Sequence, residues 1–301
     1  MLYITKKTPF IWRQFGTTFN DELELKNYFK PKILLKFFLH KLIANSSGCK
    51  AIVCTEDGCA NRTLYLGKLG VSDKKLHMVK NQRTLRATSS QMTDVRLKSD
   101  KFKIVKIGRI SEWKKIHLLV KAMVNIKNKY PKIAEDIELS IIGQTQDQEY
   151  EKSLKKLISD NRLENQIFFK KDLEYNQIEE ILKNTDLSVS LTAYNPIIES
   201  LQNNIPVITY EYGEVGKIFD NCPAVFVLCK DIKKSSFLSF EQEENILEEL
   251  ENQLLDLFKQ KEELKLIGKE GRKFVENNFP TLDEHVKEVS EIYLDILNQK
   301  S

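Results

Sequence analysis

"FKIVKIGRISEWKK", residues 102–115, carries the signals that decide the fold of this 301-residue chain. The run 102–107 is apolar and β-branched enough for a buried strand, and Gly108 follows it directly. Two cations, Arg109 and Lys114, then precede a stretch with helical periodicity at 117–130. A strand that ends at a glycine and leads into a helix is the repeating unit of a parallel α/β sheet.

The same unit recurs along the rest of the chain. We expect further strands at 137–142, 166–169, 187–191, 206–210 and 224–228, separated by helices near 147–160, 174–184 and 196–203. From about residue 241 the chain becomes helical and charged, and a Pro-Thr break precedes a last amphipathic helix near 282–298. The alternation predicts a doubly wound parallel sheet that helices cover on both faces.

The signals before residue 95 are weaker. They indicate a helix within 22–44, a clear strand at 50–54, a helix near 59–68 and a weak strand at 76–79. The polar stretch 83–100 has no periodicity and is the natural linker. Because single cores stop growing at about 250 residues, we predict a small, incomplete α/β lobe over 1–95 and a larger domain over 96–301.

Composition excludes several classes of protein. Lys and Arg number 47 against 43 Asp and Glu, which is too small a surplus for a nucleic-acid-binding face but leaves an anionic small ligand open. No two cysteines form a CxxC pair, so neither a disulfide framework nor a metal site is predicted and a cytoplasmic, reducing compartment is favoured. The five cysteines are Cys49, Cys54, Cys59, Cys222 and Cys229.

The apolar stretch "ILLKFFLHKLI" at 33–43 is too short to span a membrane and is broken by charged residues. The pattern predicts an amphipathic helix that either packs on its own domain or lies on a membrane surface. In the second case residues 30–43 would make a peripheral contact with the inner face of a membrane, and the anionic headgroups would face Lys30, Lys32, Lys36 and Lys41.

The two cations after the first strand of the larger domain are candidates for an anion site. In open α/β sheets ligands bind at the carboxyl ends of the strands, where Gly108, Arg109 and Lys114 fall. Gly108 permits a tight exit from the strand, and the cations can converge on a phosphate. Taken alone, such a pair is also typical of a solvated surface in a Lys-rich chain.

A second candidate is "NPIIES", 195–200, which again follows a predicted strand. Asn195 suits the N-cap, Pro196 suits the first helical position, and Glu199 lies one turn into the helix. The free N–H groups of a helix start suit phosphate, and a carboxylate one turn in can accept hydrogen bonds from a ribose diol. A third candidate is the turn "IIGQTQD", where Gly143 ends a strand.

Taken in order, these segments resemble the C-terminal, donor-binding domain of family 4 glycosyltransferases, which have the GT-B fold. "IGRISEWKK" is similar to the family's Gly-Arg-Leu strand exit with Lys five positions after Arg. "IIGQ" falls where the family has a Gly-Asp-Gly turn, and "NPIIESLQNNIPVITY" is similar to its "NPxxEAxxxGxPVI" signature. The break "NNFPTLDEHV" lies where the family's last helix crosses back over the cleft. The resemblance covers residues 101–301.

The resemblance implies a function and a set of roles. Arg109 and Lys114 would bind the diphosphate of a nucleoside-diphosphate sugar and stabilise the leaving group, with no metal or other cofactor needed, and Glu199 would hold the ribose. The sugar would pass with retention of configuration to a glycan or lipid-linked acceptor, in the synthesis of a surface polysaccharide or glycolipid. The further donor-binding residues would be Gly108, Gly143, Asn195, Pro196 and Ile197.

Two positions depart from the family pattern. The family often has a glutamate eight positions before Glu199, which contacts the transferred sugar, whereas this chain has Leu191 there. Leu191 cannot accept a hydrogen bond, which affects the expected sugar contact more than the nucleotide contact. The glycine expected in the "ESLQN" turn is Asn204, which tolerates a left-handed conformation.

The first lobe also resembles the family, in the late segments of its acceptor domain. The similar stretches are 12–19, 53–58 and 79–81, and the family's first strands and Gly-rich acceptor loop have no counterpart here. Two hypotheses follow: an enzyme with a short or truncated acceptor domain, or a non-catalytic subunit that binds the nucleotide sugar and needs a partner to supply the acceptor domain.

Overall fold

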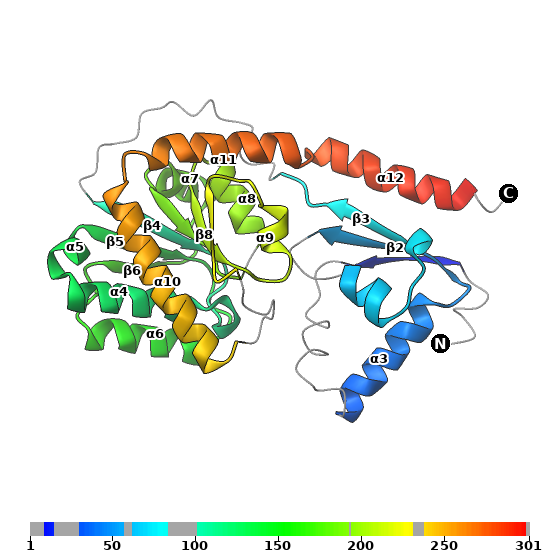
Figure 1. The fold of residues 1–301 in the computed structure, drawn as a ribbon, viewed down its shortest axis with the longest axis horizontal. Coiled ribbons are helices and arrows are strands. Elements are labelled where there is room, and N and C mark those ends of the chain that lie inside the picture. The colour runs from blue at the N-terminus through cyan, green and yellow to red at the C-terminus, as the bar shows by residue number, and fades with distance from the viewer. Residues whose placement is uncertain are drawn as a thin grey trace.

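Two parallel sheets, each with its own hydrophobic core, organise the chain in a computed structural model (Figure 1). The structure describes residues 9–14, 30–56, 62–83, 101–192, 194–230 and 238–298. The predicted linker lies almost wholly outside the described residues, as does Cys59.

The larger sheet has six parallel strands in the order β6-β5-β4-β7-β8-β9. Each of them was predicted from the sequence to within a few residues. Their bounds are β4 Phe102–Ile107, β5 Ile137–Ile142, β6 Ile167–Lys170, β7 Leu187–Val189, β8 Val207–Tyr210 and β9 Val225–Leu228. The predicted doubly wound α/β fold is therefore confirmed.

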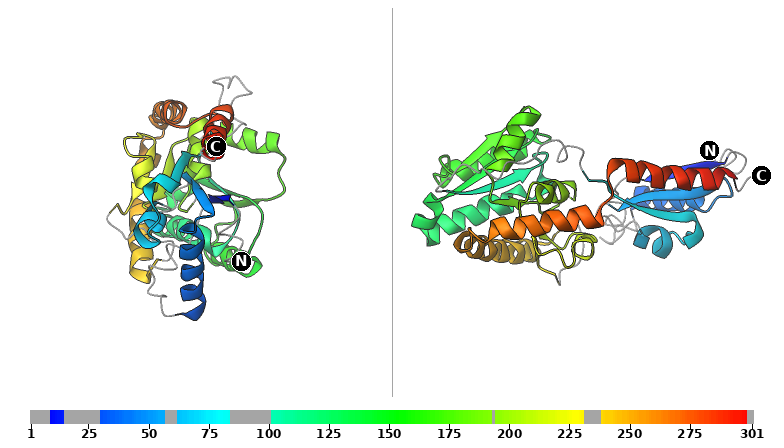
Figure 2. Two further views of the ribbon diagram at one scale, coloured as in Figure 1. Left: turned by 90° about the vertical axis from the view of Figure 1, so that its right-hand side faces the viewer. Right: turned by 90° about the horizontal axis from the view of Figure 1, so that it is seen from above.

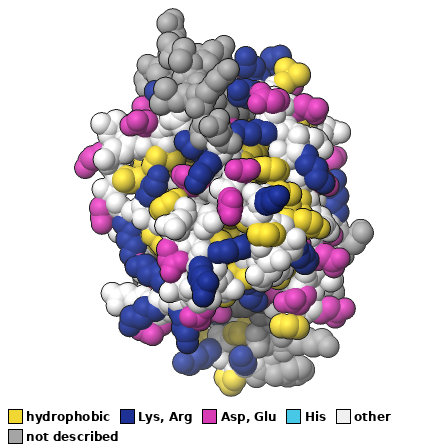
Figure 3. Space-filling view, turned by 90° about the vertical axis from the view of Figure 1, so that its left-hand side faces the viewer, with side chains coloured by type: hydrophobic (Ala, Val, Ile, Leu, Met, Phe, Trp, Pro, Cys, Tyr) yellow, Lys and Arg dark blue, Asp and Glu magenta, His cyan; other side chains and the backbone are white. Residues whose placement is uncertain are grey.

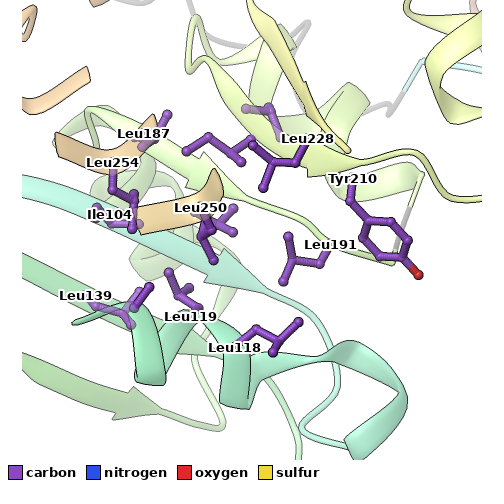
Figure 4. Close-up of a cluster of buried hydrophobic side chains, with 14 of the residues drawn as sticks. Ile104, Leu118, Leu119, Leu139, Leu187, Leu191, Tyr210, Leu228, Leu250 and Leu254 are labelled. Atoms are coloured by element: carbon purple, nitrogen blue, oxygen red, sulfur yellow. The ribbon is translucent and has the colours of Figure 1, made fainter. Parts of the chain in front are cut away.

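Helices cover both faces of this sheet, as alternate residues of the central strand show. Ile104 belongs to the main core, which α4 and α10 close (Figure 4), whereas Val105 packs with Leu182 of α7 on the opposite face. The helices are α4 Ile116–Lys129, α5 Pro131–Glu135, α6 Gln148–Asp160, α7 Tyr175–Lys183, α8 Asn195–Gln202, α9 Val215–Ile218, α10 Phe240–Lys259 and α11 Leu264–Asn278.

The smaller lobe holds a parallel sheet of the order β1-β2-β3, in which β1 is Phe10–Gln14, β2 is Cys49–Glu56 and β3 is Leu76–Lys80. The expectation of one clear and one weak strand was wrong, because β1 was missed. It is short and only half-buried along its length, so it lacks the apolar run of a buried strand. Helix α3, Pro31–Ala44, and a π-helical turn, Thr63–Lys68, cover the sheet.

The last helix joins the two lobes. α12 spans Leu282–Asn298, the residues predicted for it, and it leaves the end of α11 to lie along β3 of the smaller lobe (Figures 1 and 2). The N–H of Arg83 donates to the carbonyl of Pro280 at 2.8 Å, and a ring nitrogen of His285 lies 2.9 Å from the carbonyl of Lys80. One backbone hydrogen bond and one side-chain contact thus tie the end of β3 and the residues after it to the start of α12.

The described cysteines are buried and form no disulfide with one another: Cys49, Cys54, Cys222 and Cys229. Nowhere in the described ranges does a helix combine the length and apolarity needed to cross a bilayer. The same ranges contain no group of His, Cys, Asp or Glu that could hold a metal ion. On the face of the larger domain in Figure 3, Lys and Arg side chains are mixed with Asp and Glu, so this face is not a uniformly basic surface.

Candidate active site

The order of the larger sheet places a topological switch point between β4 and β7. From β4 the chain moves outward to β5 and β6, and it then returns to β7, which pairs with β4 on the other side. In open α/β sheets the loops that follow the strands on the two sides of a switch point leave in different directions, and ligands bind at that carboxyl edge. The two motifs singled out in the sequence lie on these two loops, since Arg109 follows β4 and Asn195 follows β7.

Two glycines hold the exits of β4 and β5 against each other. Gly108 has φ 130° and Gly143 has φ 149°, in the region that side chains rarely adopt. A Cβ atom on Gly143 would lie within 2.7 Å of the carbonyl carbon of Gly108, so any larger residue would force the loops apart. Both predicted glycines therefore shape the edge of the sheet at which the candidate site lies.

Lys114 connects the loop after β4 with the loop after β7. It ends a short 3-10 helix, Glu112–Lys114, and only 7% of it is exposed. Its Nζ lies 3.4 Å from the carbonyl oxygen of Thr192 and 4.1 Å from the centre of the Trp113 ring. The ammonium group thus sits at the switch point between two strand exits that are far apart in the sequence.

Two further polar groups beside Lys114 were not predicted. Trp113 Nε1 and Thr192 Oγ1 are buried, and neither finds a hydrogen-bond partner in the described part of the chain. A buried polar atom without a partner costs free energy that a bound ligand can recover. Trp113 could be noticed in the sequence because it precedes Lys114, whereas no local signal points to Thr192.

Arg109 differs from Lys114 in its surroundings. It is exposed, and within the described residues it forms no hydrogen bond or ion pair. The structure places it five residues before Lys114 at the same strand exit but does not bring the two side chains into contact. One cation is therefore held in place and the other is available to a ligand at the surface.

The start of α8 differs from the prediction. Asn195 is the first helical residue and Pro196 the second, while the N-cap position falls on Tyr194, whose φ −77° and ψ −49° are already helical. The N–H of Ile197 donates to the carbonyl of Tyr194 at 3.0 Å, so it is not one of the free groups expected there. The prediction was wrong because it assumed a side-chain cap, whereas the Asn195 side chain accepts a hydrogen bond from Asn81 of the smaller lobe.

The remaining positions of the signature lie as follows. Glu199 is half-buried one turn into α8, and Leu191 is buried in the main core (Figure 4). Leu191 thus packs as a core residue where the family often has a polar side chain. Asn204 has φ 57°, which confirms the predicted left-handed turn.

A lysine on β4 was missed by the sequence analysis. Lys106 is 1% exposed, and its Nζ lies 3.9 Å from where a Cβ atom of Gly108 would be. In the described residues its ammonium group makes one hydrogen bond, to the carbonyl of Ile107 at 3.1 Å, and no carboxylate lies within ion-pair distance. Burial, with a smaller contribution from the charge of Lys114, lowers the pKa of Lys106 to about 7.

A cavity of about 340 Å³ lies between the two lobes. The smaller lobe contributes Glu56, Arg62 and Lys80 to its lining, and the larger domain contributes Glu214 and Lys217. Burial raises the pKa of Glu56, with further contributions from the surrounding charges. The cavity is polar and mixed in charge, which suits a hydroxyl-rich ligand better than an apolar one.

The larger α/β domain and the second α/β lobe, joined by the crossing C-terminal helix, define a two-lobed α/β architecture. Residues 88–234 match the model of the family described as glycosyl transferases group 1. The resemblance noted in the sequence is confirmed, and the fold is the Rossmann-like GT-B fold.

Individual proteins support the same assignment. The chain is 24% identical over 304 residues to the uncharacterised glycosyltransferase MJ1069 of Methanocaldococcus jannaschii, covering 97% of this chain and 70% of that protein. Sucrose-phosphate synthase from Thermosynechococcus elongatus superimposes with a TM-score of 0.74 at 14% identity, over 99% of this chain and 70% of that one. Anabaena HepE, solved with UDP and glucose, gives 0.69 at 15% identity, over 95% and 71%.

We predict that Lys106→Met flattens the pH dependence of stability. Lys106 has a pKa of about 7 in the folded protein against an ordinary value of 10.5, so between these pH values only the unfolded chain carries the extra proton. The free energy of unfolding should therefore rise with pH across this window, by up to about 1.4 kcal/mol per pH unit. Chemical denaturation of the natural chain and the variant at about pH 7, 8 and 9 measures the difference in slope.

The matched control is Lys103→Met on the same strand, where the side chain is half-buried and away from the crevice. This variant should keep the slope of the natural chain. Equal slopes for the natural chain and Lys106→Met would show that Lys106 titrates as an ordinary lysine.

Proposed function

We propose that the chain transfers a sugar from a nucleoside-diphosphate sugar to a glycan or lipid-linked acceptor, with retention of anomeric configuration. The observation that carries the proposal is the position of Lys114, a buried cation between the exits of β4 and β7 in a fold of the glycosyl transferases group 1. A diphosphate bound at this edge of the sheet would contact the buried Lys114 on the side of the protein and the exposed Arg109 on the side of the solvent.

The two cations would act on the leaving group. When the bond between sugar and diphosphate breaks, negative charge builds up on the diphosphate, and a fixed positive charge in a dry site stabilises it more than one in water. Lys114 fits this role because the Trp113 ring and the loop at Thr192 hold its ammonium group in place. Charge neutralisation by side chains would let the reaction proceed without a metal ion.

The nucleoside would lie along α8. Glu199 is half-buried, and its carboxylate can accept hydrogen bonds from the ribose hydroxyls. Asn195 would link the donor site with the smaller lobe, since its side chain already bonds Asn81. UDP is the first nucleotide to test, because Anabaena HepE was solved with UDP and glucose and the pneumococcal O-GlcNAc transferase GtfA with UDP and GlcNAc.

Donor binding can be measured by calorimetric titration with UDP, GDP, ADP and their sugar conjugates. Arg109→Ala should weaken binding of the preferred nucleotide by about 1.5–3 kcal/mol, the range of a charge-assisted hydrogen bond, and Lys114→Ala by at least as much. Glu199→Gln should also weaken it while the fold is kept. Lys152→Ala, an exposed cation on α6 outside the crevice, should bind as the natural chain does.

Unchanged affinity in Arg109→Ala and Lys114→Ala would remove the assignment of the diphosphate site. Gross unfolding of Glu199→Gln would show that Glu199 is structural. Donor binding without any turnover would favour the other hypothesis, a nucleotide-sugar-binding subunit that needs a partner for transfer.

The stereochemistry can be tested without knowing the acceptor. Water can replace the acceptor slowly, so the chain should release free sugar from an α-linked donor, and retention predicts that the α-anomer appears before mutarotation. Proton NMR of a fresh reaction with UDP-glucose, or with the conjugate that binds best, follows both anomers. First appearance of the β-anomer would contradict a retaining mechanism.

Helix α3 supports a lipid-linked acceptor at the inner face of a membrane. One side of it packs on the smaller lobe through Ile33 and Phe37, whereas the other side exposes a stripe of large apolar side chains. At 100° per residue, Lys32 and Lys41 flank this stripe on its two edges. The stripe comprises Leu34, Leu35, Phe38, Leu39 and Leu42, each between 41% and 61% exposed.

An apolar stripe between lysines matches the interface of an anionic membrane, where apolar side chains enter the acyl region and lysines reach the headgroups. The packed side of α3 agrees with the first alternative drawn from the sequence, and the proposal assigns the second alternative to the exposed side. The proposal places the smaller lobe on the membrane and the acceptor between the lobes, where the cavity lies. It locates the chain in the cytoplasm as a peripheral protein.

Vesicle co-sedimentation tests the stripe. The natural chain should bind vesicles that contain phosphatidylglycerol more tightly than vesicles of phosphatidylcholine alone, and Leu35→Ser/Phe38→Ser should weaken binding at least about tenfold, because each inserted side chain contributes about 1.5–3 kcal/mol. Leu266→Ser/Phe240→Ser removes the same residue types at exposed positions on α11 and α10 and should bind normally. Equal binding by the two double variants would rule out α3 as the membrane contact.

A further inference from the structure

We propose that Lys106 is a third, buried cation of the donor site, which takes up a proton from solvent when the diphosphate of the donor binds. The inference rests on the proposed function, since it concerns the same crevice. It adds a residue that was not among the candidates drawn from the sequence, and it assigns to that residue the uptake of a proton on donor binding.

The first step of the argument is the position of Lys106. β4 is a central strand that is covered on both faces. Lys106 lies on this strand opposite Ile141 of the neighbouring strand β5. The side chain extends toward the carboxyl edge, because its Nζ bonds the carbonyl of Ile107 and comes close to Gly108. The amino group therefore lies directly beneath the strand exit that bears Arg109.

The second step is the lack of a counter-ion. An ammonium group has three donors, and in the described residues the Lys106 group uses one of them, on a neutral carbonyl. The other buried cation, Lys114, is the charge that acts on it, and it acts by repulsion. Lys106 lies on the same face of β4 as Ile104, and the core on that face includes the apolar side chains of Leu118 and Leu119 on α4. A buried lysine under these conditions favours the neutral amine.

The third step is what an anion would change. A diphosphate bound to Arg109 and Lys114 brings more than one negative charge into a region of low dielectric, and it offsets the repulsion from Lys114. Charges a few ångströms apart in such a region interact strongly enough to move a proton equilibrium. Lys106 would then hold its proton at neutral pH, and its positive charge would add to the field on the leaving group without contact with the substrate.

Linkage gives the sign of the pH effect. If the bound state holds one more proton than the free state, affinity for the donor falls as pH rises above the pKa of the free protein, which is about 7 for Lys106. The fall continues, at up to tenfold per pH unit, until the pKa of the bound state is reached. The diphosphate of a nucleotide sugar does not titrate near this pH, so it does not produce the same effect.

The experiment is calorimetric titration at about pH 8 with UDP-glucose, GDP-mannose or ADP-glucose, whichever the natural chain binds, in Tris and in HEPES. These buffers have different ionisation enthalpies, so the difference in heat reports protons taken up, and about one proton per donor is expected. Lys106→Met and Lys106→Gln should abolish the uptake and make the affinity independent of pH between about 7 and 9. Two substitutions of Lys106 are used so that one remains if the other variant fails to fold. The control Lys103→Met should bind the donor and take up protons as the natural chain does.

The possible outcomes distinguish a failure of the proposed function from a failure of the role of Lys106. No binding of any of the three donors by the natural chain would overturn the proposed function and this inference with it. Binding without proton uptake, or uptake that persists in the Lys106 variants, would overturn the role of Lys106 alone and leave the donor site in place.

Discussion

The pairing of β4 with β7 is the constraint on which the rest of the structure depends. Because β7 returns to the side of β4 opposite to β5, the connections after these neighbouring strands leave the sheet in different directions. Open α/β sheets bind ligands at the carboxyl edge beside such a switch point. The residues after β4 and the first turn of α8 are distant in sequence, yet this one pairing brings both to the same edge of the sheet, where Lys114 meets the loop at Thr192.

The crevice is electrostatically unusual because its cations lie at different depths. Arg109 is exposed, Lys114 is almost buried and Lys106 is fully buried, and the described residues place no carboxylate in an ion pair with Lys106. Burying two lysines near each other costs stability in the free protein, either through repulsion between two ammonium groups or through loss of the Lys106 proton on folding. The same arrangement favours a ligand with several negative charges, since such a ligand relieves the repulsion and meets a field that water does not screen. Stability and binding are thus opposed at this site.

The two lobes divide the proposed work between donor and acceptor. α12 crosses from the end of α11 to β3, and the backbone hydrogen bond of Arg83 and the side-chain contact of His285 hold the smaller lobe against its start. The polar cavity between the lobes and the exposed apolar side of α3 lie on the parts of the molecule where an acceptor and a lipid surface would be met. The match to the glycosyl transferases group 1 model covers residues 88–234, and the proposal assigns the acceptor contacts to the smaller lobe.

The sequence by itself determined the strands and helices of the larger domain, the place of α12 and the candidates Arg109, Lys114 and Glu199. These depend on periodicity and on the order of motifs, which are local properties of the chain. Only the tertiary structure decided that β1 pairs with β2, that Asn195 bonds Asn81 instead of capping α8, and that Lys106 is buried beneath Gly108. Each of these depends on neighbours that are distant in sequence or on burial, because contacts made through space leave no repeating pattern in the chain itself.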